Sequence, residues 1–461
     1  MNLDHLIKNL YTDNDIKIRE IQNGHKTIYI IFIETICDTT SINDFLLRSI
    51  INKKIRSIDD ISNDLPNVKI TNVKNQDDFY TLLFQGFSII SIDDRFIAFE
   101  TRRSLDSGIL ESQNEKAVKG PKDAFTENYE SNIGLIRKRI RSKDLIIKEF
   151  TIGIESKTKV AVIYMDNIAK EELVNKVIKK VDNISIDYLP NNNYISEIIN
   201  DKNNIMPTTI NSERPDMICF GIMNGKVAII VENTPQGMLI PAFFKDYIHT
   251  IDDYYQNERN VSITRIIRLI AFVLSLIIPG LYLALTTFNQ ETLPISLLIN
   301  FSIQREGVPF PSVVEAILLW LVFEILKESD TRIPYVVGTS MSIVGAIVLG
   351  DAAATAGIIS PIMIIIMAIS SISTFLFNDN DMVNAIRIWK LIFIILSSFV
   401  GLYGLFIASL LFIVNLCTTK SYDFDYISPE NIKDQKDSII LTKKFKLNKR
   451  NKILTTNIKR R

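Results

Sequence analysis

The sequence predicts a soluble, two-lobed α/β (α+β) region followed by an all-α domain that crosses a membrane. Charged residues are frequent up to residue 265, whereas long apolar runs dominate residues 266–419. Two of these runs, 269–290 and 391–419, contain no charged residue over 22 and 29 positions. About 20 apolar residues cross a bilayer as a helix, and a buried core helix, the alternative, rarely reaches such lengths. We therefore expect an N-terminal lobe (1–110), a second lobe (111–260), a transmembrane domain (261–419) and a basic tail (420–461).

Charge placement determines the topology that we expect for the membrane domain. Arg259, Arg265 and Arg268 stand just before the first apolar run, and residues 443–461 hold nine Lys or Arg and no acid. Such cationic flanks stay on the cytosolic side of a membrane. Both ends of the domain then lie on one side, which requires an even number of crossings.

Four spans plus one short or re-entrant helix satisfy this condition. The spans are expected at about 266–288, 311–327, once within 333–377, and 391–416. Residues 293–301 are too few to cross and form an interfacial or short helix. The 46 residues from 333 to 378 are interrupted only by Asp351, so they hold either two spans or one span and a re-entrant piece. The loop with Asp379 and Asp381 then lies outside.

Short β-rich runs alternate with helical spacing in the soluble half, which is typical of α/β lobes. In the first lobe we expect strands at 28–36, 87–92 and 96–101 and helices at 42–58 and 77–85. In the second lobe we expect strands at 145–154, 159–165, 217–222 and 226–231 and helices at 171–181 and 194–200. A polar stretch near residue 110 separates the two units.

Several classes of function have no support in the composition. The three cysteines and three histidines are dispersed, which argues against a disulfide framework and a metal site. Neither a phosphate-binding loop nor a nucleophile elbow is present, so we expect no cofactor and no enzyme. A net charge of zero indicates no nucleic-acid partner. The N-terminus lacks the basic and apolar regions of a signal peptide, and the soluble half is expected in the cytosol.

Two carboxylates lie inside the predicted span at 311–327. An acid in the bilayer core costs roughly 3 kcal/mol, so it persists where it meets water, a pore or a partner. Glu315 and Glu324 are nine residues apart, which puts them about 180° apart around a straight helix. We expect one to face a hydrated path while the other bonds a neighbouring helix or sits at the inner interface. Snorkelling of both to opposite membrane surfaces is the alternative.

A stripe of small residues runs through the next apolar region at intervals of four, a pattern that lets helices approach closely. It reflects either tight packing within one subunit or a ring of identical helices around a narrow path. In a ring, Asp351 would favour cations, and Ile347 or Leu349 would close the path by dewetting. The candidate path residues are Ser342, Ala346, Ile347, Leu349, Gly350, Asp351 and Ala354.

Longer motifs occur in both halves. In the membrane half they are REGVPFP at 305–311, VEA at 314–316, FEIL at 323–326, SIVGA at 342–346, AA at 352–353 and AG at 356–357. In the soluble half they are KGP at 119–121, FTE at 125–127, TKV at 158–160, ERPD at 213–216 and DYY at 253–255, with 137–142 and 231–241. Over about residues 90–420 the chain resembles the GerA family of spore germination proteins, the A subunits of germinant receptors. It departs from the family pattern at Trp320, Asp351 and Asn233.

The resemblance implies a place in the inner membrane of dormant spores. It also implies two partners, a transporter-like B subunit that binds nutrient and a C subunit that is a lipoprotein. Such A subunits resemble oligomeric channels that release monovalent cations, with residues 342–357 on or near the path. A non-conducting scaffold that couples the sensor to other channels is a competing function. A secondary transporter is disfavoured, because four spans without an internal repeat provide no two-fold architecture for alternating access.

Overall fold

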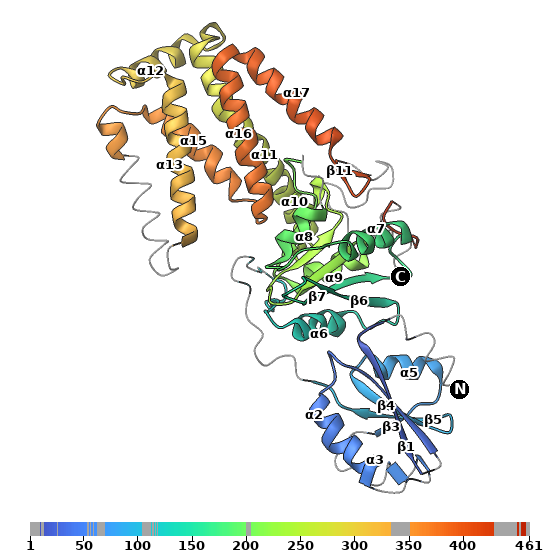
Figure 1. Cartoon of the computed structure of the whole chain (residues 1–461). Coiled ribbons are helices and arrows are strands. Elements are labelled where there is room, and N and C mark those ends of the chain that lie inside the picture. Colours follow the sequence, from blue (N-terminus) through green and yellow to red (C-terminus); the bar gives the residue numbers. More distant parts are fainter. Residues whose placement is uncertain are drawn as a thin grey trace.

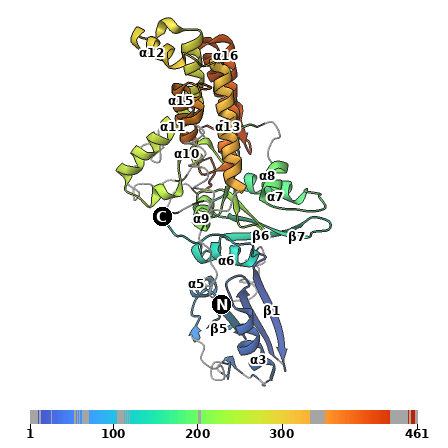
Figure 2. The same cartoon turned by 90° about the vertical axis from the view of Figure 1, so that its left-hand side faces the viewer.

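A first lobe, a second lobe and a helix bundle follow one another along the molecule (Figures 1 and 2). The structure is a computed structural model. It describes residues 10–103, 112–199, 204–332, 351–427 and 450–457, with short gaps at 11–12, 25, 53–54, 56, 59, 62–69, 113–114, 116, 118 and 451–452.

The first lobe is an antiparallel sheet in the order β1-β2-β4-β5-β3. Its strands are β1 (Ile16–Asn23), β2 (Lys26–Ile33), β3 (Ile70–Asn72), β4 (Phe87–Ile92) and β5 (Arg95–Glu100). Its helices are α2 (Thr39–Ser41), η1 (Ile42–Leu47), α3 (Arg48–Asn52) and α5 (Gln76–Leu83). Asp93 and Asp94 form the β4–β5 turn at φ 47° and 59°, a left-handed conformation that Asp tolerates better than most residues.

The second lobe repeats this topology with the order β6-β7-β9-β10-β8. Its strands are β6 (Leu145–Ile152), β7 (Thr158–Met165), β8 (Ile210–Ser212), β9 (Val227–Val231) and β10 (Gly237–Ile240). Its helices are α6 (Tyr129–Arg139), α7 (Glu171–Asp182), α8 (Asn192–Ile199), α9 (Pro215–Met223), α10 (Phe244–Ile248) and the 3-10 helix η2 (Ile251–Tyr254). Counted from the start of each lobe, the strand order is the same.

One strand predicted in the second lobe is wrong, because residues 217–222 belong to α9. Pro215 stands in the first turn of this helix, where its fixed φ favours helix and its missing N–H costs nothing. Ile218, Cys219 and Ile222 are buried, so the segment is apolar on most sides. A short apolar run of this kind has no periodicity that separates a buried helix from a buried strand.

A buried arginine joins the two lobes. Arg137 of α6 is fully buried and forms ion pairs with Asp13 and Asp15, which lead into β1. Its guanidinium also donates to the Leu145 carbonyl at 3.1 Å and lies 5.5 Å from the centre of the Phe84 ring. Part of the basic run 137–143 therefore forms a contact between the two lobes and is not only a solvated helix end. Burial raises the pKa of Asp15 although Arg137 opposes that shift.

The bundle follows the second lobe. Its helices are α11 (Glu258–Thr287), η3 (Gln290–Thr292), α12 (Ile295–Arg305), α13 (Ser312–Arg332), α15 (Pro361–Thr374), α16 (Asn380–Val400) and α17 (Leu402–Thr418). Within the described ranges, α11 and α16 are long and apolar enough to cross a membrane, and α15 and α17 are shorter apolar helices. The total of four spans stays a prediction.

The predicted span at 391–416 is wrong, because the chain reverses direction within it. Gly401 ends α16 at φ 64° and ψ −136°, a conformation that glycine adopts without strain, and α17 begins at the next residue. The side-chain oxygen of Asn289 accepts from the Leu402 amide at 3.2 Å, so the reversal lies at the far end of α11. Charge counting does not detect such a turn, since no charge marks it.

The loop before α16 lies beside the second lobe and not at the opposite end of the bundle. The Phe377 ring is 5.9 Å from that of Phe272 in α11, which is 5.2 Å from that of Phe244 in α10. The placement of Asp379 and Asp381 on the outer side is therefore corrected. Acidic residues contribute little to membrane orientation, so in the sequence only the number of spans predicts on which side these two lie.

The segment after α17 returns to the second lobe. A hairpin of β11 (Lys420–Ser421) and β12 (Phe424–Asp425) is followed by Tyr426, which is fully buried and accepts from the Phe244 amide at 3.1 Å. Farther along, Thr455 pairs with Ala169 and Leu454 is 2% exposed. These described parts of the predicted basic tail therefore belong to the folded second lobe.

Candidate functional site: a charged junction between the second lobe and the bundle

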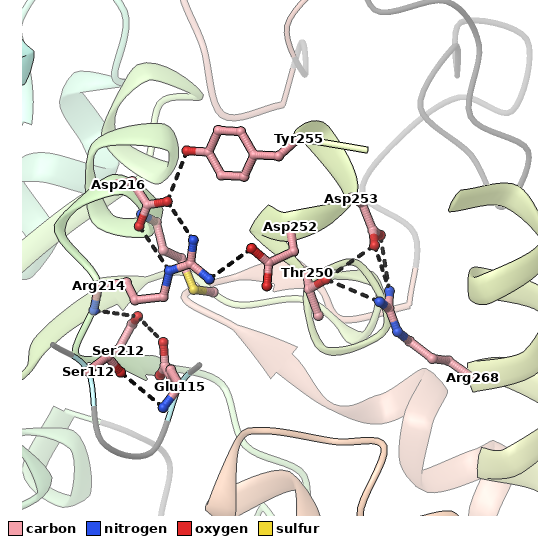
Figure 3. A network of polar contacts seen from close by, with 11 residues as sticks. Ser112, Glu115, Ser212, Arg214, Asp216, Thr250, Asp252, Asp253, Tyr255 and Arg268 are labelled. Atoms are coloured by element: carbon pink, nitrogen blue, oxygen red, sulfur yellow. Dashed lines mark hydrogen bonds and ion pairs between the residues drawn. The ribbon is translucent and has the colours of Figure 1, made fainter. Parts of the chain in front are cut away.

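The junction begins at the Glu-Arg-Pro-Asp motif that opens α9 (Figure 3). Arg214 is 3% exposed and donates to both carboxylate oxygens of Asp216, at 3.1 and 2.7 Å. Its remaining nitrogen donates to Asp252 of η2 at 3.0 Å. One arginine thus bonds carboxylates from two elements, and the paired bonds to Asp216 are the strong bidentate kind.

The carboxylates keep this arginine charged. Burial works against the charged form of Arg214, but the hydrogen bonds and charges of Asp216 and Asp252 outweigh it and raise its pKa above the ordinary value. The Tyr255 hydroxyl donates to Asp216 at 2.9 Å, and burial together with that carboxylate raises the pKa of the phenol. The cluster therefore holds its protons across the physiological range and serves as a structural ion pair.

The other half of the junction lies on α11. Asp253 is 1% exposed and accepts from Arg265 at 2.9 Å and from Arg268 at 3.0 Å. Arg268 also donates to the Ile248 carbonyl at 2.9 Å and to the Thr250 hydroxyl at 3.2 Å. Two cations of the first bundle helix therefore converge on one buried carboxylate of the second lobe.

Aromatic packing and one glycine complete the junction. The Tyr254 ring lies 4.5 Å from the Phe220 ring of α9, and the Arg265 guanidinium lies 5.9 Å from the Tyr254 ring centre. Gly120 of the Lys-Gly-Pro motif fits against this cluster. A Cβ atom on Gly120 would stand 2.7 Å from both Arg214 Nη2 and Tyr255 Cε2, so only glycine fits without displacement.

Ser112 and Glu115, which precede α6 in the chain, add a second set of acidic contacts. Ser112 donates to Glu213 at 3.0 Å, and Ser212 donates to Glu115 at 2.6 Å. The Ser212 hydroxyl also accepts from the Arg214 amide at 3.1 Å, which links Glu115 to the arginine. Burial, with Glu213 nearby, raises the pKa of Glu115 to about 7. This carboxyl therefore titrates near neutral pH.

The predicted site residues lie elsewhere in the chain, between positions 315 and 354. Five of them fall outside the described residues: Ser342, Ala346, Ile347, Leu349 and Gly350. Asp351 and Ala354 stand in a short helical stretch at 351–355 and are not fully buried. Glu315 is fully buried and accepts from Ser360, whereas Glu324 pairs with Arg387 of α16 at 3.4 Å. The two acids bond different neighbouring helices.

Sequence reasoning missed the junction as a functional unit. In the sequence, Arg214, Asp216 and Asp253 stand out only as motif positions, and Arg265 and Arg268 only as topology signals. The available signal was two acidic residues followed, 12 to 16 positions later, by arginines at the start of a long apolar helix. That spacing crosses from one element to the next, so no single-element periodicity predicts the contact.

Within the described ranges, no group of three or more His, Cys, Asp or Glu side chains could hold a metal ion.

Comparison with known proteins decides the family. A family model described as Bacillus/Clostridium GerA spore germination protein matches residues 4–453. This chain belongs to the GerA family. The match includes both lobes and the bundle, so the junction described above lies inside the family's shared region.

Individual GerA relatives are similar over nearly the whole chain. Spore germination protein KA of Bacillus subtilis is 34% identical over 93% of this chain and 81% of its own length. Spore germination protein GerQA of Bacillus cereus is 32% identical over 95% of this chain and 89% of its own length. A crystal structure of the N-terminal domain of the A subunit of the Bacillus megaterium germinant receptor GerK3 is 28% identical, with a TM-score of 0.40, over 53% of this chain and 94% of that one.

Proposed function

We propose that this chain is the A subunit of a nutrient germinant receptor in the inner membrane of a spore, where copies assemble into a ligand-gated channel for monovalent cations. The observation that carries the proposal is the junction in which Asp253 of the second lobe bonds Arg265 and Arg268 of α11. It provides a short, charged route by which a change in the soluble region displaces the first spanning helix.

The surface of the bundle supports membrane insertion. Large apolar side chains on its helices remain exposed, as expected where lipid is the solvent. Examples are Ile266, Ile270 and Val273 of α11, Ile317, Leu321 and Ile325 of α13, Ile365 and Ile372 of α15, Ile388 and Phe399 of α16, and Phe406 and Leu410 of α17. Because α11 leaves the second lobe and the segment after α17 returns to it, our proposal puts both ends of the bundle on the cytosolic side.

The buried core supports transmission from the lobe to the bundle. One continuous apolar core runs from the second lobe into the bundle and includes Tyr247, Phe272, Trp389 and Phe412. A separate apolar cluster joins α13 and α15 to the C-terminal part of α11 and to Ile394 of α16. Leu283, Leu319 and Met363 are among its members. Ser370 of α15 also donates to the Ser275 carbonyl of α11 at 2.8 Å. We infer that the second lobe, α11, α15, α16 and α17 move as one body, against which α13 shifts.

Gating follows from this division. Nutrient bound by the transporter-like B subunit, with the lipoprotein C subunit present, shifts the closed-to-open equilibrium of the oligomer. The path comprises Ser342, Ala346, Ile347, Leu349, Gly350, Asp351 and Ala354, with Asp351 favouring cations and Ile347 or Leu349 closing the path by dewetting. The buried Glu315 and the partly exposed pair of Glu324 and Arg387 support a transport role, because ionisable groups in membrane helices mark ion pathways.

The test is potassium efflux from liposomes that contain the full chain together with its B and C subunits. Adding nutrient is expected to release potassium, whereas liposomes with the B and C subunits alone are expected to release none. An intact complex that binds nutrient and releases no potassium would instead favour the non-conducting scaffold. Ile347→Ala and Leu349→Ala are expected to leak without nutrient, because each removes apolar constriction.

A further inference from the structure

The first turn of α15 is capped by a residue from another helix. Ser360 occupies the N-cap position, yet its side chain makes no capping bond to its own helix. Instead the Oε2 atom of Glu315, in the first turn of α13, accepts from the Ser360 amide at 2.8 Å and from its hydroxyl at 2.7 Å. Both residues are fully buried. A carboxylate at a helix N-terminus is favoured by the helix dipole and by the free amides there.

A third residue extends this contact to α12. The Nε atom of Arg305 lies 3.8 Å from the Oε1 atom of Glu315, and neither atom has a hydrogen-bond partner among the described residues. A buried carboxylate is costly without a compensating cation, so Arg305 offsets the charge of Glu315. The Arg305 side chain is 29% exposed, which leaves it able to turn toward solvent.

The backbone makes a second contact at the same place. Gly357 and Gly307 both have positive φ, 67° and 89°, and a Cβ atom on Gly357 would stand 3.5 Å from the Gly307 carbonyl oxygen. The turn before α15 thus lies against the turn before α13. The residues immediately upstream are Asp351 and Ala354, the described part of the candidate ion path.

We infer that Glu315 is a positioning residue of the gate: with Arg305 and Ser360 it clamps the segment at 351–360 to the start of α13 and keeps the path closed. This inference rests on the proposed function. Opening then requires α13 and α15 to separate at their N-termini. Arg305 follows Glu315 or turns to solvent, and the first turn of α15 loses its cap.

The clamp itself is tested by accessibility, without reference to conduction. Ile359 is 6% exposed and adjoins Ser360, so Ile359→Cys reports opening through reaction with a small membrane-permeant thiol reagent. Cys417 is exposed and is replaced by Ser, whereas Cys37 and Cys219 are buried. With the full receptor complex, Glu315→Ala is expected to speed labelling roughly tenfold or more. Ser329→Ala is the matched control on α13, because the Ser329 hydroxyl bonds the Ile325 carbonyl of its own helix.

Potassium efflux from the same liposomes tests the consequence for the gate. Glu315→Ala is expected to leak without nutrient, and Glu315→Gln, which keeps an acceptor for Ser360 and loses the charge, is expected to leak less. Labelling that stays at the wild-type rate in both folded variants would overturn the clamp. Faster labelling without a leak, in a complex that conducts with nutrient, would overturn its role in the gate. A wild-type complex that never conducts would refute the proposed function while the labelling result still stands.

Discussion

Asp252 and Asp253 are adjacent in the chain and bond opposite sides of the junction. Asp252 accepts from Arg214 of the second lobe at 3.0 Å, and Asp253 accepts from Arg265 of α11 at 2.9 Å. The short 3-10 helix that carries them therefore connects the lobe to the first bundle helix. Arg265 is fully buried, and the Asp253 carboxylate offsets its charge.

Replacing Asp253 by Ala should uncouple the bundle from the second lobe. It leaves Arg265 buried without its carboxylate, a change that costs on the order of 3–5 kcal/mol. We expect a lower Tm of the detergent-solubilised chain and a loss of nutrient-triggered potassium efflux. Arg259→Ala is the control, because Arg259 is exposed on the same helix. Wild-type efflux from a folded Asp253→Ala complex would contradict a coupling role.

Gly120→Ala should destabilise the same junction from the other side. The added methyl group would stand 2.7 Å from Arg214 and from Tyr255, and overpacking of this kind costs about 1–3 kcal/mol. Thermal unfolding should show a Tm below wild type. The double variant Gly120→Ala, Tyr255→Ala should recover part of the loss, because it removes the ring that the methyl group would meet. Lys119→Ala, at the exposed neighbouring position, should leave the Tm unchanged. Equal Tm values for Gly120→Ala and wild type would contradict the overpacking, because they would show that Arg214 and Tyr255 accommodate the methyl group.

The carboxyl of Glu115 should make stability depend on pH. Burial raises its pKa in the folded chain from the ordinary 4.5 to about 7, so the folded state binds more protons than the unfolded state between these values. Its contribution to stability is therefore full below about pH 4.5 and is lost as the pH rises to 7. Glu115→Gln should flatten the fall in Tm between pH 5 and pH 7. An unchanged slope in Glu115→Gln would assign the dependence to other groups.

Arg137→Ala should weaken the contact between the lobes. Asp13 and Asp15 would remain buried without their cation, which costs about 3–5 kcal/mol. We expect a lower Tm, together with faster proteolysis of the first lobe. The triple variant Arg137→Leu, Asp13→Asn, Asp15→Asn should recover most of the loss, since it removes all three charges. Arg141→Ala, which changes an exposed arginine, is the control, and a triple variant no better than Arg137→Ala would refute the charge explanation.

Local pattern was enough to predict several elements. The strands at 87–92 and 96–101 and the helix at 171–181 match β4, β5 and α7 within a residue or two, because alternation and helical spacing are properties of one segment. The opposite directions of Glu315 and Glu324 also follow from helix geometry alone. The segment at 217–222 shows where this reasoning ends, since a short apolar run suits both α9 and a strand.

The family, the two α/β lobes and the long apolar helices are predictable from the sequence, because each depends on composition, motif or period along one stretch of chain. Which charges meet is settled by the tertiary structure. Ser360 receives its cap from a residue 45 positions earlier, and Arg137 bonds an aspartate 122 positions away. It also decided that the loop before α16 lies beside the second lobe. Such contacts depend on how separate elements pack, and packing is set by the combined burial of many side chains, which no local pattern records.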